Sequence, residues 1–173
     1  MKTRDLTLLA LLIALVTVAT MIVRVPIPAT GGYVNMGDSM VYIAALLFGP
    51  LFGLVAGGVG SALADYFGGY GSFAPYTLVI KGIEGLLVGL LAWRLLRHQT
   101  AATVAGTAVA AVAILTGGGA MVLGYFLAEA YVLGLGVAKA AQEVPANIFQ
   151  VVGGLIVALP VTLALRRIVP ATR

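Results

Sequence analysis

The fold of this chain is decided by residues 40–65, MVYIAALLFGPLFGLVAGGVGSALAD, in which 25 uncharged residues precede Asp65. An apolar run of this length is typical of a segment that lies in lipid, where a lone charge is costly. Small residues recur at every fourth position from Gly49 to Ser61, and Asp65 continues the same helical face. This spacing predicts close packing against another helix. The chain is therefore predicted to be an integral membrane protein with a carboxylate near one membrane surface.

The composition supports the same class. Of the 173 residues, 61% are hydrophobic and only 9% are charged, whereas soluble domains carry about 25% charged residues. The length suits one compact bundle, so we expect a single all-α transmembrane domain over residues 1–173. Cysteine is absent, which excludes disulfides, thiolate nucleophiles and cysteine metal sites.

Four other apolar runs predict further spans, over residues 6–23, 76–93, 102–130 and 145–165. The first run is longer than the apolar core of a signal peptide, about 7–15 residues, so we expect a retained helix. Pro145 is expected in the first turn of the last span. Residues 117–119 are all glycine, which is compatible with close helix packing or with a broken helix of the kind that lines transporter sites.

The distribution of basic residues predicts that residues 40–64 cross the membrane twice. Gly49-Pro50 supplies a turn signal at the right place. Two crossings give six spans with both ends cytoplasmic, and seven of the ten Lys and Arg residues then lie inside, as the positive-inside rule expects. These residues are Lys2, Arg4, Arg94, Arg97, Arg166, Arg167 and Arg173, with His98 beside them.

In this topology residues 24–38, 66–75 and 131–144 form external loops rich in polar and aromatic residues, which indicates a binding vestibule. The first loop contributes Asn35 and Asp38, although Asp38 is also suited to capping the following helix.

The second loop begins beside Asp65 and contains Tyr70. A tyrosine ring can stack on a flat ligand. Tyrosine also populates the membrane interface without any ligand, so both interpretations stay open.

Lys81 and Glu84 are three positions apart inside an apolar run, and so lie on one helical face. A charge within the membrane is a candidate functional residue. A mutual ion pair that only satisfies both groups explains the pattern equally well, and the sequence leaves these alternatives open.

Glu143, Asn147 and Gln150 are spaced by four and three positions, which places them on one face at the start of the last span. Amide side chains offer a donor and an acceptor together, which suits a neutral heterocyclic ligand. The alternative is hydrogen bonding between helices. For Glu129, ligand capture and solvent exposure both remain open.

Several chemistries are excluded. No phosphate-binding glycine loop with Lys-Ser/Thr occurs, so the chain is not expected to hydrolyse ATP. His98 is the only histidine, and no serine–histidine–acid set can be assembled. We expect no catalytic residue, no metal site and no cofactor. Ala10 and Ala14, on one face of the first span, would let a partner helix approach closely.

Four motifs together resemble the substrate-binding S components of energy-coupling factor (ECF) transporters. They are NMGDSMVY at 35–42, FGPLFG at 48–53, AGGVGSALAD at 56–65 and KGIEG at 81–85. The resemblance covers nearly the whole chain and is closest to the riboflavin-type branch, which includes hydroxymethylpyrimidine and pyridoxine transporters.

The resemblance implies a subunit that captures a vitamin or vitamin precursor from outside. A transmembrane T component and two cytoplasmic ATPases would supply the energy, and the subunit would topple in the membrane to deliver its ligand. Ala10 and Ala14 match the face of the first helix that contacts the T component in this family.

Two rival functions remain at this stage. A self-sufficient ion-coupled transporter or channel would use Asp65, Lys81 and Glu84 as a relay. A small membrane enzyme or scaffold is the other, although no catalytic set supports an enzyme.

Overall fold

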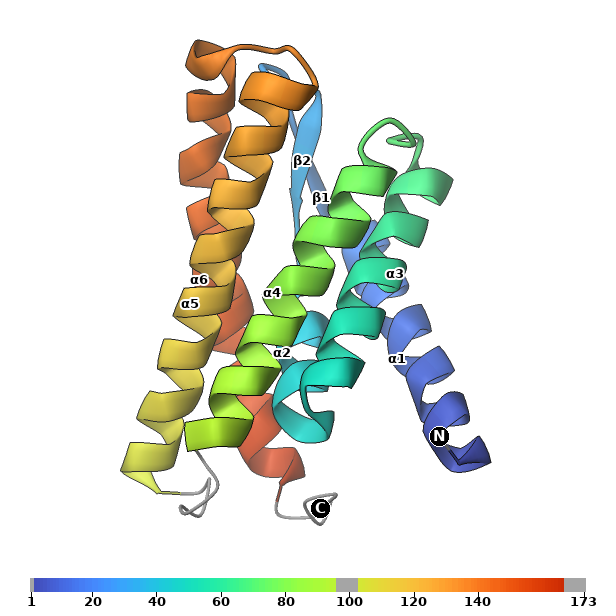
Figure 1. Cartoon of the computed structure of the whole chain (residues 1–173), viewed down its shortest axis with the longest axis vertical. Coiled ribbons are helices and arrows are strands. Elements are labelled where there is room, and N and C mark those ends of the chain that lie inside the picture. Colours follow the sequence, from blue (N-terminus) through green and yellow to red (C-terminus); the bar gives the residue numbers. More distant parts are fainter. Residues whose placement is uncertain (1, 96–102, 167–173) are drawn as a thin grey trace.

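The computed structural model describes residues 2–95 and 103–166, which form a bundle of long helices with a short hairpin at one end (Figure 1). The elements are α1 (Thr3–Ile22), β1 (Arg24–Ile27), β2 (Gly32–Asn35), α2 (Gly37–Phe48), α3 (Pro50–Gly68), α4 (Ala74–Leu95), α5 (Val104–Leu127), the π-helix η1 (Ala128–Val132) and α6 (Val137–Leu165). The prediction of six helices in an all-α membrane bundle is confirmed.

The turn at Gly49 divides the central apolar run into two helices, as predicted. Gly49 has a φ of 91°, a backbone conformation that favours glycine, and Pro50 is the first residue of α3. At 12 residues, α2 extends only about 18 Å. It is too short to cross the apolar core alone, and its largest side chain, Tyr42, is fully buried in the bundle.

Within the part of the chain that the structure describes, four helices or helical segments are long and apolar enough to cross a membrane: Thr3–Ile22, Pro50–Gly68, Val104–Val132 and Val137–Leu165.

The small residues of α3 let this helix approach α4 closely, which confirms the packing prediction. A Cβ atom added at Gly57 would lie 2.8 Å from the backbone carbonyl oxygen of Lys81. A larger residue at this position would force the two backbones apart, so the spacing of the helices depends on glycine.

The ends of the helices follow the predicted topology. The amino end of α1 and the carboxyl end of α6 lie at the same end of the bundle as the carboxyl end of α4 and the amino end of α5 (Figure 1). The hairpin, residues 69–73 and residues 128–136 gather at the opposite end, called here the hairpin end. Four residues used in the charge count, Arg97, His98, Arg167 and Arg173, lie outside the described residues.

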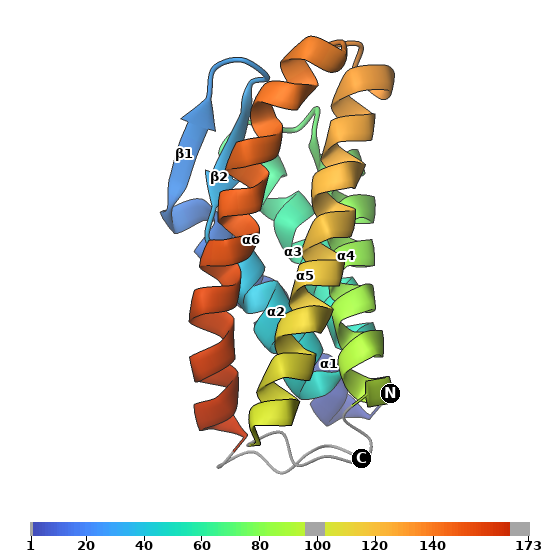
Figure 2. The same ribbon diagram turned by 90° about the vertical axis from the view of Figure 1, so that its left-hand side faces the viewer.

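Two of the predicted external loops, residues 24–38 and 131–144, consist largely of strands or helix. Most of residues 24–38 forms the antiparallel hairpin β1–β2, in which Arg24 pairs with Asn35, and β2 lies beside α6 (Figure 2).

The predicted start of the last span is wrong. α6 begins at Val137 rather than at Pro145, so residues 133–136 alone connect η1 to α6. The residues before Pro145 are good helix formers, and α6 accommodates the proline in its interior.

The three consecutive glycines do not break α5, which is continuous from Val104 to Leu127. A Cβ atom at Gly117 would lie 2.8 Å from the carbonyl oxygen of Glu84 on α4. The close-packing interpretation is confirmed for Gly117 and Gly118 but not for Gly119, where an added Cβ would meet nothing within 4 Å, and the broken-helix alternative is wrong. The irregularity occurs later, where η1 widens the helical turn.

Candidate binding pocket

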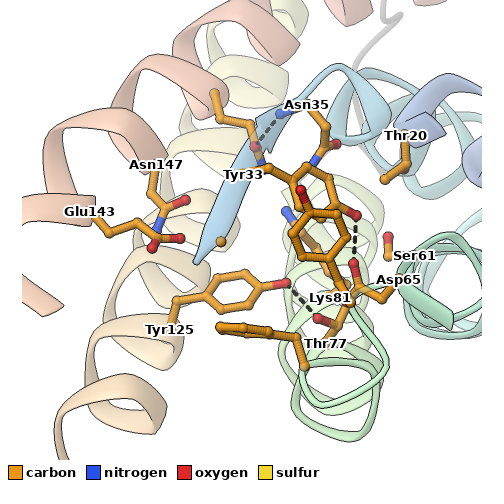
Figure 3. A pocket seen from close by; sticks show the side chains of 14 residues that line it. Thr20, Tyr33, Asn35, Ser61, Asp65, Thr77, Lys81, Tyr125, Glu143 and Asn147 are labelled. Carbon is orange, nitrogen blue, oxygen red and sulfur yellow. Dashed lines mark hydrogen bonds between the residues drawn. The ribbon is translucent and has the colours of Figure 1, made fainter. Parts of the chain in front are cut away.

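A pocket opens among the helices at the hairpin end (Figure 3), with about 400 Å³ of empty space, open solvent at its mouth included. Its walls come from α1, β2, α3, α4, α5, α6 and residues 69–73. The lining residues are Thr20, Gly32, Tyr33, Asn35, Ser61, Asp65, Tyr70, Phe73, Thr77, Lys81, Tyr125, Glu143, Asn147 and Gln150.

One wall of the pocket is aromatic. The ring centroids of Tyr33 and Tyr70 are 4.5 Å apart with the planes tilted by 50°. The Arg24 guanidinium lies 5.7 and 5.9 Å from these two centroids, within the range of a cation–π contact. Across the pocket, the Tyr125 hydroxyl donates a hydrogen bond to the Thr77 hydroxyl at 3.0 Å, which joins α5 to α4. A flat ligand would meet aromatic surface from both sides.

The hairpin is tied to α3 at the pocket mouth. The Tyr33 hydroxyl donates a hydrogen bond of 2.5 Å to the carboxylate of Asp65, which is buried (Figure 3). Burial, reinforced by the neighbouring Asp65 charge, raises the pKa of Tyr33 far above its ordinary value. The tyrosine therefore stays protonated and remains a donor.

The opposite wall is the polar face of α6. Glu143, Asn147 and Gln150 are all buried and all line the pocket. Gln150 donates to Asp38 at 2.9 Å and accepts from the Asn35 backbone at 2.8 Å. For this residue the structure shows hydrogen bonds to other elements of the bundle, which was the predicted alternative to ligand contact.

Asn147 differs from Gln150. Its side chain makes no hydrogen bond with the described residues, and it projects into the pocket beside Glu143 (Figure 3). Both the donor and the acceptor of its amide are therefore available to a ligand.

Lys81 is held in a buried cluster of charges. Its ammonium group bonds to Asp38 and lies 3.0 Å from Glu84, and the Tyr42 hydroxyl donates to Glu84 at 2.7 Å. The ion-pair interpretation of Lys81 and Glu84 is therefore realised, with Asp38 as a third member. Asp38 makes no capping hydrogen bond at the start of α2, so its predicted capping role is wrong.

Most residues proposed from the sequence meet at this pocket. Seven of the nine line it, namely Asn35, Asp65, Tyr70, Lys81, Glu143, Asn147 and Gln150. Asp38 and Glu84 do not line it, and they contact it only through Lys81.

The site residues proposed from the sequence did not include the other lining residues, namely Thr20, Gly32, Tyr33, Ser61, Phe73, Thr77 and Tyr125. Tyr33 had a signal, because it lies in the first of the external loops predicted to form the vestibule. Ser61 had a signal, since it belongs to the small-residue face of α3. Thr20 and Thr77 place hydroxyl groups within or beside apolar runs, which is only a weak indication of a binding site. No local sequence feature indicates that Tyr125 lines the pocket.

Ala10 and Ala14 lie on α1 and are not among the residues that line the pocket. Both are exposed, while Leu12 and Val16 of the same helix are buried. α1 itself lies at the edge of the bundle (Figure 1), so this face is open to a partner within the membrane.

The residues around the pocket do not resemble a metal centre. Within residues 2–95 and 103–166, no three His, Cys, Asp or Glu side chains are grouped as metal ligands. The lining of the pocket offers aromatic surface, amides and carboxylates to a ligand.

Comparisons with known proteins agree with the fold. The chain is 49% identical over 142 residues to an uncharacterised protein of Pyrococcus woesei, covering 82% of this chain and 88% of the relative. It is 31% identical over 156 residues to the thiamine precursor transporter HmpT of Lactococcus lactis, covering 90% of this chain and 83% of that protein.

A solved structure of the S component of a bacterial ECF transporter has the same fold, with a TM-score of 0.71 and 19% identity over 97% of this chain and 98% of that one. The family model described as "ECF-type riboflavin transporter, S component" matches residues 1–167. The chain therefore belongs to this S-component family and is a multi-pass membrane protein that serves as a substrate-binding transport subunit, not an enzyme.

Proposed function

We propose that this subunit captures an unphosphorylated vitamin precursor with a single aromatic ring, of the hydroxymethylpyrimidine or pyridoxine class. The relative HmpT is named as a thiamine precursor transporter. The observation that carries the proposal is the pocket itself, which places an aromatic wall opposite an unpaired amide, Asn147.

The volume of the pocket favours a small ligand. Ligand sites generally enclose about 300–1,000 Å³, whereas the enclosed space here is only about 30 Å³. A single substituted ring would need the pocket walls to move apart less than the three fused rings and sugar-like chain of riboflavin would.

The charges around the pocket favour a ligand without phosphate. Lys81 is the only Lys or Arg among the lining residues, and Asp38 and Glu84 already balance its charge. A phosphate would have to compete with these carboxylates and would also face Asp65 and Glu143. Neutral or cationic heterocycles meet no such penalty.

Transport would require partners, as it does for the family. We propose that the exposed face of Ala10 and Ala14 receives a transmembrane T component, and that two cytoplasmic ATPases supply the energy. The bundle would then topple to bring the hairpin end to the cytoplasmic side. Short side chains on α1 support this docking because they permit close contact between helices.

Native mass spectrometry of the gently purified protein tests the substrate class. We expect a co-purified pyrimidine or pyridine, and titration calorimetry should then give sub-micromolar binding of the unphosphorylated compound and at least tenfold weaker binding of its phosphate ester. Tight binding of riboflavin alone, or preference for the phosphate ester, would overturn the assignment.

Reconstitution into liposomes tests whether uptake by this subunit requires partner proteins. Uptake into liposomes should require the T component and both ATPases. Uptake by the purified chain alone, driven by an ion gradient, would instead support the relay of Asp65, Lys81 and Glu84.

A further inference from the structure

A buried pair of carboxyl groups stands at one wall of the pocket. Glu143 of α6 lines the pocket, and Glu129 lies on the π-helix η1, which packs against α6 so that the two carboxyl groups interact electrostatically. Glu129 has no exposed surface, and neither of its oxygens receives a hydrogen bond from a donor group of the described residues. Glu143 is better satisfied, since the Thr30 hydroxyl of the hairpin donates to it.

No cation among the described residues balances this pair. Lys81 is engaged by Asp38 and Glu84. Arg24 donates to the Gly68 carbonyl oxygen and lies over the aromatic wall. Two buried carboxylates side by side cannot both stay ionised without a proton or a cation between them.

The surroundings of Glu129 and Glu143 differ enough to assign which carboxyl group is protonated and which is ionised. Glu129 is wholly enclosed and has no donor from the described residues, which favours the neutral, protonated form. Glu143 receives the Thr30 hydrogen bond and faces the pocket, which favours the ionised form. The wall therefore presents the negative charge of Glu143 to a ligand, and the protonated carboxyl group of Glu129 lies on the side away from the pocket.

We propose, on the basis of the function proposed above, that the Glu129–Glu143 pair selects substrates by an amino group adjacent to a protonatable ring nitrogen. Glu143 accepts the hydrogen bonds of that edge, and Glu129 keeps the shared proton and holds the Glu143 carboxylate in place. An ionised carboxylate matches two parallel N–H donors, one on the ring and one on the amino group. The ligand class is therefore a 4-aminopyrimidine or a ring of the same donor pattern.

A ligand with a protonated ring nitrogen would also balance the negative charge of the pocket. The pocket exposes the carboxylates of Asp65 and Glu143, whereas its lysine is already paired. A ligand that protonates on binding would supply the missing positive charge beside Glu143. A ring with a carbonyl oxygen at the same position would direct an acceptor at the carboxylate and be rejected.

Titration calorimetry with two probes tests the proposal on the full-length purified protein. The first is 4-amino-5-hydroxymethyl-2-methylpyrimidine, and the second is its analogue with a carbonyl oxygen in place of the 4-amino group. We expect wild-type protein to prefer the amino probe by about 100-fold or more, because a site built for a donor leaves its polar groups unpaired with the analogue.

Two isosteric variants separate the roles. Glu143→Gln should reduce the preference below about fivefold, because the amide no longer matches two donors. Glu129→Gln should keep the preference within about threefold of wild type, since glutamine is neutral like the protonated acid and still donates to Glu143. Gln142→Ala, at an exposed neighbouring position, is the matched control and should change neither affinity.

Each remaining outcome has a distinct meaning. Equal wild-type affinity for the two probes, equal weakening of both by Glu143→Gln, or loss of the preference in Glu129→Gln would overturn the pair's role while leaving the function proposed above intact. Failure of wild-type protein to bind either probe would overturn the pair's role and restrict the function proposed above to the pyridoxine class. If Glu143→Gln does not fold, the wild-type ratio and Glu129→Gln still decide.

Discussion

The hydroxyl of Tyr33 in β2 and the carboxylate of Asp65 in α3 are 2.5 Å apart, so one hydrogen bond holds the hairpin against the helix at the pocket mouth. These residues are 32 positions apart in the chain. Because both line the pocket, we expect the bond to help hold the hairpin over a bound ligand.

Removing this bond should loosen the closed pocket. Tyr33→Phe keeps the ring contact with Tyr70 but loses the charge-assisted hydrogen bond, worth about 1.5–3 kcal/mol. We expect ligand affinity to fall by about tenfold or more through faster dissociation, measured by stopped-flow displacement. Tyr66→Phe, at an exposed tyrosine, is the control. Unchanged dissociation in Tyr33→Phe would show that the bond does not retain the ligand.

The buried charge cluster should matter for stability. Lys81→Met leaves Asp38 and Glu84 buried without their cation, a loss that typically costs about 3–5 kcal/mol. Thermal unfolding in detergent should show a clearly lower midpoint. Combining Lys81→Met with Asp38→Asn and Glu84→Gln removes the uncompensated charge and should restore most of the stability. No recovery in the triple variant would contradict an electrostatic origin.

Two neighbouring amides on α6 should respond differently to truncation. Asn147→Ala should weaken ligand binding by about tenfold with little change in stability, because the side chain has no hydrogen-bond partner among the described residues. Gln150→Ala should lower stability as well, because its bonds to Asp38 and Asn35 are lost. Calorimetry and thermal unfolding on both variants check this contrast. Equal destabilisation by both would refute it.

The docking face on α1 can be tested without touching the pocket. Ala10→Trp should block uptake by the complete transporter while leaving ligand affinity within about twofold, because the bulky ring prevents close helix contact. Leu15→Trp, another exposed position on α1, is the control and should transport normally. Loss of ligand binding in Ala10→Trp, or normal uptake, would argue against partner docking at this face.

Sequence by itself determined the membrane class, the division of residues 40–64 into two helices at Gly49-Pro50 and the end of the bundle where polar residues gather. Hydropathy, the Gly49-Pro50 turn and the basic residues at helix ends are local signals, and each acts within a few residues. They also identified seven residues of the pocket, since polar groups in apolar helices are conspicuous.

Apart from the local pair Lys81–Glu84, the partners of these residues were decided by the tertiary structure. Lys81 meets Asp38 across 43 positions of chain, and Gln150 meets Asp38 across 112. Tyr125 and Glu129 enter the site because α5 packs against α4 and η1 against α6. The start of α6 was misjudged because packing in a bundle outweighs the local effect of Pro145. Contacts of this kind depend on which helices pack together, which no short stretch of sequence encodes.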